Sequence, residues 1–279
     1  MIACMFQGQG SQKEGMADQL LEKYEEEFEI TSEILGESVK EICLHNDEKL
    51  RNTKYTQPIL FLINDLMYRE YCIYNEEPQY LIGHSLGEYN ALCAAKVFSF
   101  EEGVKLTKIR GELMASVGEG SMLAIIDLPF EEVEEIIANF NRVYISNINS
   151  FAQVVVSGEK DEIRKLQSFL QKNNVKSVVL NVSGAFHSPY MAPVIPTFRE
   201  TLEVIELSEP AKIVVSNFSA LPYTKENIIN NLCLHLTNPV RWVESNIYLK
   251  QQGVEKMVQI GQGHTLNAFA RNIWKYSNT

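Results

Sequence analysis

Hydrophobic and polar positions follow strand and helix periods in turn along most of the chain. The apolar run at residues 1–6 ends at Gly8-Gln9-Gly10, which predicts a buried strand and a turn into a helix. Residues 57–74 have a helical pattern with Pro58 expected in the first turn. Further elements are expected as a strand at 79–82, a helix at 86–95, a helix capped by Ser99 and Glu102, and strands at 211–216 and 254–260, each followed by a helix.

The pattern changes between residues 121 and 183. The expected elements are a strand at 122–127, a helix at 130–140, strands at 143–148 and 153–157, a helix at 161–171 and a strand at 177–182. This βαββαβ order is that of the ferredoxin-like unit. We therefore expect an α/β fold in which residues 1–120 and 184–279 form a large domain with a mostly parallel sheet, and residues 121–183 form a small inserted ferredoxin-like domain.

Composition and charge narrow the class of protein. Of the 279 residues, 45% are hydrophobic and 22% are charged, which is typical of a globular protein. No apolar run approaches the roughly 20 residues of a membrane span. The net charge of -11 disfavours nucleic-acid binding. The five cysteines are scattered and never spaced as CxxC, which predicts reduced thiols in a cytoplasmic protein and no metal site.

The clearest local motif is Gly83-His84-Ser85-Leu86-Gly87, which lies between a predicted strand and a predicted helix. A G-x-S-x-G turn in this context lifts the serine hydroxyl above a sheet, where it can act as a nucleophile. The N–H of Leu86 would then point to the place where an oxyanion forms. The alternative is an ordinary strand-to-helix turn with an incidental serine.

A nucleophilic serine requires a base, and the chain has five histidines. His187 is the best candidate, because it stands where the inserted domain returns to the large one, and such a seam favours a ligand cleft. It could equally be a structural histidine. The other four have simpler interpretations: packing for His84, solvation for His45, and helix ends for His235 and His264.

The two Gly-Gln-Gly segments could suggest a nucleotide site. They are Gly8-Gln9-Gly10 and Gly261-Gln262-Gly263. Lys13 and Leu266 occupy the place of the third glycine, so neither segment completes G-x-G-x-x-G. A flexible turn at a strand end explains the first segment equally well.

Together, these motifs resemble an ordered set of blocks in a known family. The blocks are Phe6–Gln12, Gly83–Tyr89, Arg110-Gly111 with Met114, Asn147–Gly158, Gly184–Ser188, and Asn238-Pro239-Val240 with Trp242. They look like those of the malonyl-CoA:acyl-carrier-protein transacylases and polyketide-synthase acyltransferase domains. A separate chain ending at Thr279 looks most like a discrete trans-acting polyketide-synthase acyltransferase. The resemblance implies a large domain of the α/β-hydrolase-like type.

The resemblance implies catalytic roles for five positions. Ser85 would be the nucleophile and His187 the base. The backbone carbonyl of His235 would orient His187, at a position where the family commonly has glutamine. The backbone N–H groups of Gln9 and Leu86 would form the oxyanion hole. No acidic third partner for the histidine is evident from the sequence.

The resemblance also implies a substrate pocket. Arg110 would hold the malonyl carboxylate, because a guanidinium offers it a bidentate fork. Phe186 would crowd an α-methyl group and favour malonyl over methylmalonyl. Four further positions match the lining of the family's cleft: Gln57, Met114, Asn149 and Gln153.

Gln7, Phe151 and Gln262 replace prolines common in the family, which would loosen the loops around Gln9.

The predicted function is ping-pong transfer of malonyl from malonyl-CoA to the phosphopantetheine thiol of an acyl carrier protein or polyketide-synthase carrier domain, for polyketide or fatty acid synthesis. The coenzyme A thioester is a substrate, and no bound cofactor is expected. Three alternatives are an acyl hydrolase of the same fold, an α/β-hydrolase esterase with a Ser–acid–His triad and no inserted unit, and an inactive scaffold in a synthase complex.

Overall fold

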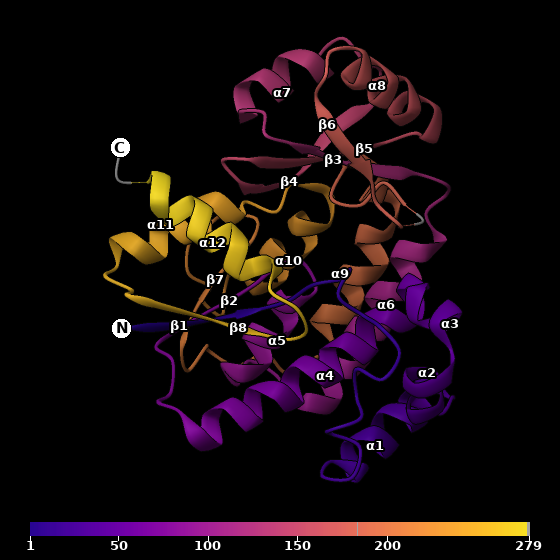
Figure 1. The fold of residues 1–279 in the computed structure, drawn as a ribbon. Coiled ribbons are helices and arrows are strands. Elements are labelled where there is room, and N and C mark those ends of the chain that lie inside the picture. Colours follow the sequence, from indigo (N-terminus) through magenta and orange to yellow (C-terminus); the bar gives the residue numbers. More distant parts are fainter. Residues whose placement is uncertain (183, 278–279) are drawn as a thin grey trace.

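The computed structural model describes residues 1–182 and 184–277. Its strands form two separate four-stranded sheets, and Figure 1 shows the smaller part of the molecule above the larger. Ser183, the last residue of the predicted small domain, and residues 278–279 lie outside the described residues. Among the described residues, no helix combines the length and the apolar character that crossing a membrane would require.

The large sheet is parallel and has the strand order β7-β2-β1-β8. Its strands are β1 (Ile2–Phe6), β2 (Tyr80–Gly83), β7 (Ile213–Val215) and β8 (Lys256–Ile260). Its helices are α1 (Glu25–Leu35), α2 (Val39–His45), α3 (Asp47–Arg51), α4 (Thr53–Tyr74), α5 (Gly87–Ala94), α6 (Phe100–Ser116), α9 (Ile195–Glu203), α10 (Ile228–Thr237), α11 (Trp242–Gln251) and α12 (Thr265–Tyr276), with the 3-10 helix η1 (Pro189–Val194) before α9.

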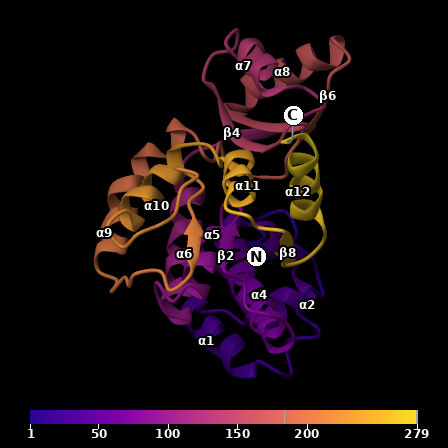
Figure 2. The same ribbon diagram turned by 90° about the vertical axis from the view of Figure 1, so that its left-hand side faces the viewer.

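Helices cover both faces of the central strands β1 and β2, which are almost wholly buried. On β1, Ala3 and Met5 pack with the apolar faces of α11 and α12. Cys4 and Phe6 point the other way, into a core shared with α5, α6, α9 and α10. Figure 2 shows α9 and α10 well separated from α12 across the molecule. The carboxyl ends of β1 and β2 therefore lie between two layers of helices, facing the small sheet.

The small sheet is antiparallel, with the order β4-β5-β3-β6. Its elements are β3 (Ser121–Ile126), α7 (Phe130–Ile137), β4 (Val143–Ser150), β5 (Gln153–Gly158), α8 (Lys160–Lys172) and β6 (Lys176–Val179). Leu123 and Ile125 face α7 and α8, whereas Met122 and Ala124 face the large sheet's core. The predicted fold, a parallel α/β sheet with a small βαββαβ unit, is confirmed.

Two local predictions were wrong. The chain does not enter a helix after Gly8-Gln9-Gly10; residues up to 23 form irregular turns, and α1 begins only at Glu25. The fourth helix begins at Thr53, capped by the side chain of Asn52, so Pro58 lies in its second turn. Both differences reflect polar turn and cap residues, which carry no hydrophobic period. The predicted capping box of Ser99 and Glu102 is present at α6.

Candidate active site

Ser85 stands in a tight turn between β2 and α5. Its φ of 52° is left-handed, a conformation that non-glycine residues adopt only under constraint. The glycines on either side make the turn possible, because a Cβ on Gly83 would lie 1.9 Å from the backbone of Gly87, and one on Gly87 would lie 2.2 Å from the carbonyl oxygen of Phe6. Ser85 is therefore held at the end of β2, at the start of a helix.

His187 is the histidine that reaches Ser85. Its Nε2 lies 2.8 Å from Ser85 Oγ, although 102 positions separate them in the chain. Its Nδ1 donates to the backbone carbonyl of His235 at 2.9 Å, which leaves Nε2 as the acceptor toward the serine. That carbonyl lies in the last turn of α10, where helix carbonyls lack an intrahelical partner.

The environment of His187 keeps its imidazole neutral. The side chain is almost fully buried, and this burial is the main cause that holds its pKa well below its usual range. The neighbouring His235 and the guanidinium of Arg110 lower the pKa further, because both disfavour a second positive charge. A buried neutral imidazole in contact with a hydroxyl is suited to accept its proton.

Arg110 approaches Ser85 from α6. Its Nη2 lies 3.3 Å from Ser85 Oγ, and its Nη1 donates to Gln57 Oε1 at 2.7 Å. The Gln57 amide in turn donates to Met114 Sδ at 3.4 Å. Arg110 is only 1% exposed, with its guanidinium carbon 5.3 Å from the ring centroid of Tyr89.

Arg110 makes no direct ion pair with any described residue, although the buried Glu88 acts on its charge from a greater distance. The ion pairs that arginines form among residues 1–182 and 184–277 do not include Arg110. Burial lowers its pKa, but a guanidinium remains protonated in proteins. A buried cation without an anion is costly, so this position is suited to an anionic ligand.

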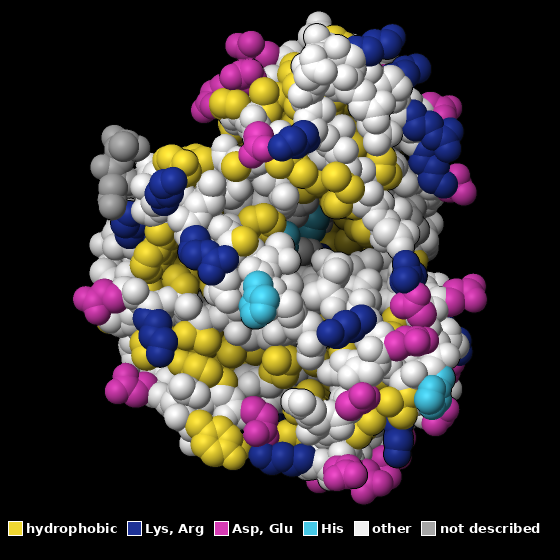
Figure 3. Space-filling model, in the orientation of Figure 1, with side chains coloured by type: hydrophobic (Ala, Val, Ile, Leu, Met, Phe, Trp, Pro, Cys, Tyr) yellow, Lys and Arg dark blue, Asp and Glu magenta, His cyan; other side chains and the backbone are white. Residues whose placement is uncertain are grey.

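The residues meet in one cavity of about 410 Å³ between the two sheets. Figure 3 shows a hollow in this face of the molecule, with histidine atoms visible in its depth. Ten of the predicted site residues line it: Gln9, Gln57, Ser85, Leu86, Arg110, Met114, Asn149, Gln153, Phe186 and His187. His235 lies behind the lining, with its side chain fully buried.

The backbone N–H groups of Gln9 and Leu86 are available to a ligand. In the described part of the chain, neither N–H has a hydrogen-bond partner. Both residues line the cavity beside Ser85. An unpaired N–H at such a place is a suitable donor to an oxyanion.

Asn149 and Gln153 form a hydrogen-bonded chain with His84. Asn149 Oδ1 lies 2.7 Å from His84 Nε2, and its amide donates to Gln153 Oε1 at 2.8 Å. The His84 ring also packs against Trp242, with ring centroids 5.3 Å apart. Burial lowers the pKa of His84 to about 4, so it is neutral and positions Asn149 in the cavity wall.

The loop before Gln9 is held by hydrogen bonds. The Gln7 N–H donates to the carbonyl of Ile260 at 3.2 Å, and its carbonyl accepts from the Asn64 amide at 2.8 Å. Gln7 is buried. Two hydrogen bonds therefore anchor the Gln7 backbone where the family commonly has proline, and the looser loop expected from the sequence stays a prediction.

Three residues that surround the serine turn, outside the cavity lining, were not found from the sequence. Asn217 binds both sides of the turn: its amide donates to the Gly83 carbonyl at 2.6 Å and its Oδ1 accepts from the Ser85 N–H at 2.8 Å. Glu88 is fully buried below it and accepts from Tyr223 OH at 2.8 Å. Glu88 stands inside the G-x-S-x-G-E segment and could have been noted there, whereas Asn217 and Tyr223 have no sequence signal.

Comparisons with known proteins agree with this geometry. Residues 4–261 match the family model described as "Acyl transferase domain". The polyketide biosynthesis malonyl CoA-acyl carrier protein transacylase PksC of Bacillus subtilis (strain 168) is 40% identical, over 99% of this chain and 98% of its own length. The corresponding protein BaeC of Bacillus velezensis is 38% identical, over 98% of this chain and 96% of its own.

Solved structures give the same result. The malonyl CoA-acyl carrier protein transacylase of Burkholderia pseudomallei superposes with a TM-score of 0.95 at 35% identity, over 99% of this chain and 98% of that one. A malonyl-transacylase in complex with a type II polyketide-synthase acyl carrier protein gives 0.91 at 32% identity, over 98% and 93%. The chain therefore belongs to the acyl transferase family that includes the malonyl CoA-acyl carrier protein transacylases.

Proposed function

We propose that this protein transfers malonyl from malonyl-CoA to the phosphopantetheine thiol of an acyl carrier protein through an acyl-Ser85 intermediate. One observation carries the proposal. The Ser85 hydroxyl lies 2.8 Å from a buried neutral imidazole and 3.3 Å from a buried guanidinium without a direct ion pair, in one cavity. A nucleophile, a base and a carboxylate clamp are the three groups that malonyl transfer requires.

In the first half-reaction, His187 Nε2 takes the proton of Ser85 Oγ as the oxygen attacks the thioester carbonyl. The N–H groups of Gln9 and Leu86 donate to the resulting oxyanion, a contribution of about 3–4 kcal/mol per donor. The intermediate collapses by breaking the C–S bond, and the imidazolium returns its proton to the coenzyme A sulfur. Malonyl remains as an ester on Ser85.

The second half-reaction reverses these steps with a different thiol. His187 deprotonates the phosphopantetheine thiol, whose sulfur attacks the Ser85 ester. The serine oxygen leaves and regains the proton from His187. Because the nucleophile and the base are both side chains, the proposed cycle uses no resident cofactor, and the two thioesters enter only as substrates.

Arg110 selects the acyl group in this proposal. A bound malonyl carboxylate supplies the direct ion pair that the guanidinium lacks, whereas an acetyl group leaves it buried and unpaired. Phe186, buried in the cavity wall, would crowd a branched α-carbon. Gln57 and Met114 fix the position of the guanidinium, and Asn149 and Gln153 line the acyl and pantetheine path.

We also propose a pathway and a compartment for this protein. PksC and BaeC are named for polyketide biosynthesis, and the transacylase solved with a polyketide-synthase carrier protein has the same fold. We therefore assign the acceptor as a carrier protein or carrier domain of a polyketide synthase. The described cysteines are all free, which favours the cytoplasm.

We assign the small domain to residues 121–183.

The alternatives lack a supporting observation. A hydrolase that clears uncharged acyl groups has no use for a buried guanidinium beside its nucleophile. An α/β-hydrolase esterase needs a carboxylate on its histidine, whereas Nδ1 of His187 donates to a backbone carbonyl, and the chain contains the inserted small sheet.

The test is mass spectrometry of the intact protein after incubation with malonyl-, methylmalonyl- and acetyl-CoA. We expect a malonyl adduct on Ser85 that persists and then passes to added holo carrier protein. Ser85→Ala should give no adduct. Release of free malonate faster than transfer to the carrier would favour the hydrolase, and transfer by Ser85→Ala would exclude the proposed mechanism.

A further inference from the structure

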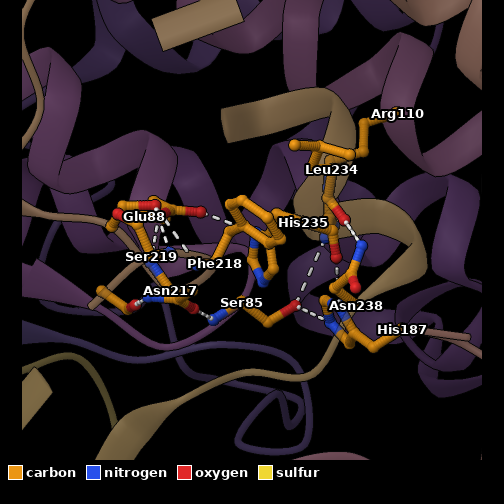
Figure 4. Close-up of polar contacts among 12 residues, drawn as sticks. Ser85, Glu88, Arg110, His187, Asn217, Phe218, Ser219, Leu234, His235 and Asn238 are labelled. Carbon is orange, nitrogen blue, oxygen red and sulfur yellow. Dashed lines mark hydrogen bonds and ion pairs between the residues drawn. The ribbon is translucent and has the colours of Figure 1, made fainter. Parts of the chain in front are cut away.

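Five residues form a closed ring of polar contacts, here called the polar ring (Figure 4). The Ser85 N–H donates to Asn217 Oδ1 at 2.8 Å, and the Asn217 N–H donates to Glu88 Oε1 at 2.6 Å. Glu88 Oε2 lies 2.6 Å from His235 Nδ1. The His235 carbonyl accepts from His187 Nδ1 at 2.9 Å, and His187 Nε2 returns to Ser85 Oγ at 2.8 Å.

Glu88 joins the two halves of this ring. Its carboxylate is fully buried, so it needs hydrogen-bond donors to replace water. One oxygen has two donors, Asn217 N–H and Tyr223 OH. The other lies within ion-pair distance of His235 Nδ1, but the two atoms are not aligned for a hydrogen bond. Glu88 also lies in the first turn of α5, with its N–H donating to the Ser85 carbonyl at 3.1 Å, so its position is coupled to the turn that carries the serine.

His235 makes two of the contacts in the polar ring, one through its side chain and one through its backbone carbonyl. Its side chain faces Glu88, while its backbone carbonyl receives the Nδ1–H of His187. Its ring also stacks on that of His187, with centroids 4.6 Å apart and an interplanar angle of 24°. Fixing the side chain therefore fixes the carbonyl and one face of the imidazole.

We propose that Glu88 and the side chain of His235 are positioning residues that keep the His187 imidazole aligned with Ser85. Together they do what a carboxylate bound directly to that imidazole would otherwise do. This inference rests on the proposed function of Ser85 and His187. Neither side chain reaches the cavity lining, so both act through other residues. Small displacements of a catalytic group slow the chemical step strongly. Binding of malonyl should change little, because the Arg110–Gln57 contact that would bind it lies outside the ring.

The test compares substitutions of His235 with a control at Tyr223. His235→Asn keeps a side-chain N–H at the position of Nδ1, which faces Glu88, His235→Gln carries its amide one bond beyond that position, and His235→Leu has no donor. Tyr223→Phe removes a donor from the same carboxylate but leaves every contact of the ring. The measurement is the single-turnover rate of Ser85 acylation at saturating malonyl-CoA, with the half-saturating concentration and the thermal midpoint.

For the leucine variant we expect acylation slower by about 10-fold or more, with a half-saturating malonyl-CoA concentration within about twofold of wild type. The glutamine variant should be intermediate, and it decides the question if the leucine variant does not fold. The asparagine variant should stay within about threefold of wild type. Tyr223→Phe should lose stability but acylate within about twofold of wild type.

Two results would overturn the role of the polar ring. One is equal acylation rates for the glutamine, asparagine and leucine variants. The other is a slowing in Tyr223→Phe as large as that in the leucine variant, which would indicate a general loss of stability. Failure of wild-type protein to acquire malonyl on Ser85 is a separate result, and it would overturn the proposed function itself.

Discussion

Ser85 and His187 both have a left-handed backbone, with φ angles of 52° and 54°. Such a conformation costs a non-glycine residue about 1–2 kcal/mol. It persists only where surrounding contacts impose it. At Ser85 these are the close approach of Gly83 to Gly87 and the hydrogen bond from its N–H to Asn217. The two residues that meet through Oγ and Nε2 are thus both held in strained positions.

Relief of this strain should raise stability while activity is lost. Ser85→Ala and Ser85→Gly both remove the hydroxyl, but only glycine adopts a positive φ freely. We expect the glycine variant to be more stable than the alanine variant by about 0.5–1 kcal/mol in urea unfolding, after the greater flexibility of the unfolded glycine chain is subtracted.

Ser168 in the middle of α8 provides the control, because helix interiors favour alanine over glycine by about 1 kcal/mol. There the glycine variant should be the less stable one. The same order at Ser85 as at Ser168 would show that the turn is not strained.

Arg110→Ala should separate malonyl from acetyl transfer. Truncating one partner of a buried charge pair costs about 2–5 kcal/mol, so kcat/KM for malonyl-CoA should fall by about 100-fold or more, with a much smaller change for acetyl-CoA. Steady-state transfer of each acyl group to holo carrier protein measures this. Arg142→Ala is the matched control, because that side chain is 68% exposed and should change neither rate. An equal loss for both substrates would show that Arg110 does not read the carboxylate.

Acylation should remain fast in mildly acidic solution. The active form of His187 is neutral, and burial, His235 and Arg110 hold its pKa well below the usual range of a histidine. Lowering the pKa extends the neutral form to lower pH. The single-turnover acylation rate should therefore stay level from about pH 8 through 6.5 and decline only below that, where an exposed histidine would already be half protonated.

His235→Gln should move this decline to higher pH, because it removes a neighbour that disfavours the imidazolium. Arg110 and His84 remain and act in the same direction. A decline centred at or above pH 6.5 in wild type would contradict the buried, neutral base.

The G-x-S-x-G turn and the α/β order were predictable because they depend on local rules. Gly83 and Gly87 can be recognised from the sequence, since only glycine permits the backbone contacts that their Cβ positions would block. The strand and helix periods around them are equally local. The pattern of apolar residues also predicted the small sheet. Alternate residues of β3 are apolar because Leu123 and Ile125 face α7 and α8, while Met122 and Ala124 face the large sheet's core.

The contacts around the turn depend on residues distant in the chain. Asn217 reaches Ser85 across 132 positions, and Tyr223 reaches Glu88 across 135. Neither belongs to a periodic pattern, and asparagine after a short strand is most often an ordinary turn residue. His187 was identified by its place at the domain seam and by family resemblance, but its contact with the His235 carbonyl depends on where α10 ends, which the sequence does not determine by local rules.

Phe186→Ala should broaden the acyl group that the enzyme accepts. The ring is 5% exposed and lines the cavity beside His187, so its removal opens space next to the α-carbon of a bound malonyl group. Discrimination by one methyl group is worth about 1–3 kcal/mol, so the ratio of kcat/KM for methylmalonyl-CoA to that for malonyl-CoA should rise by about 10-fold. Competition between the two thioesters, read by mass spectrometry of the Ser85 adduct, gives this ratio directly. Phe169→Ala on the exposed face of α8 is the control for loss of an aromatic ring. A ratio unchanged in Phe186→Ala, with normal acylation by malonyl-CoA, would show that the α-methyl group does not point toward this ring.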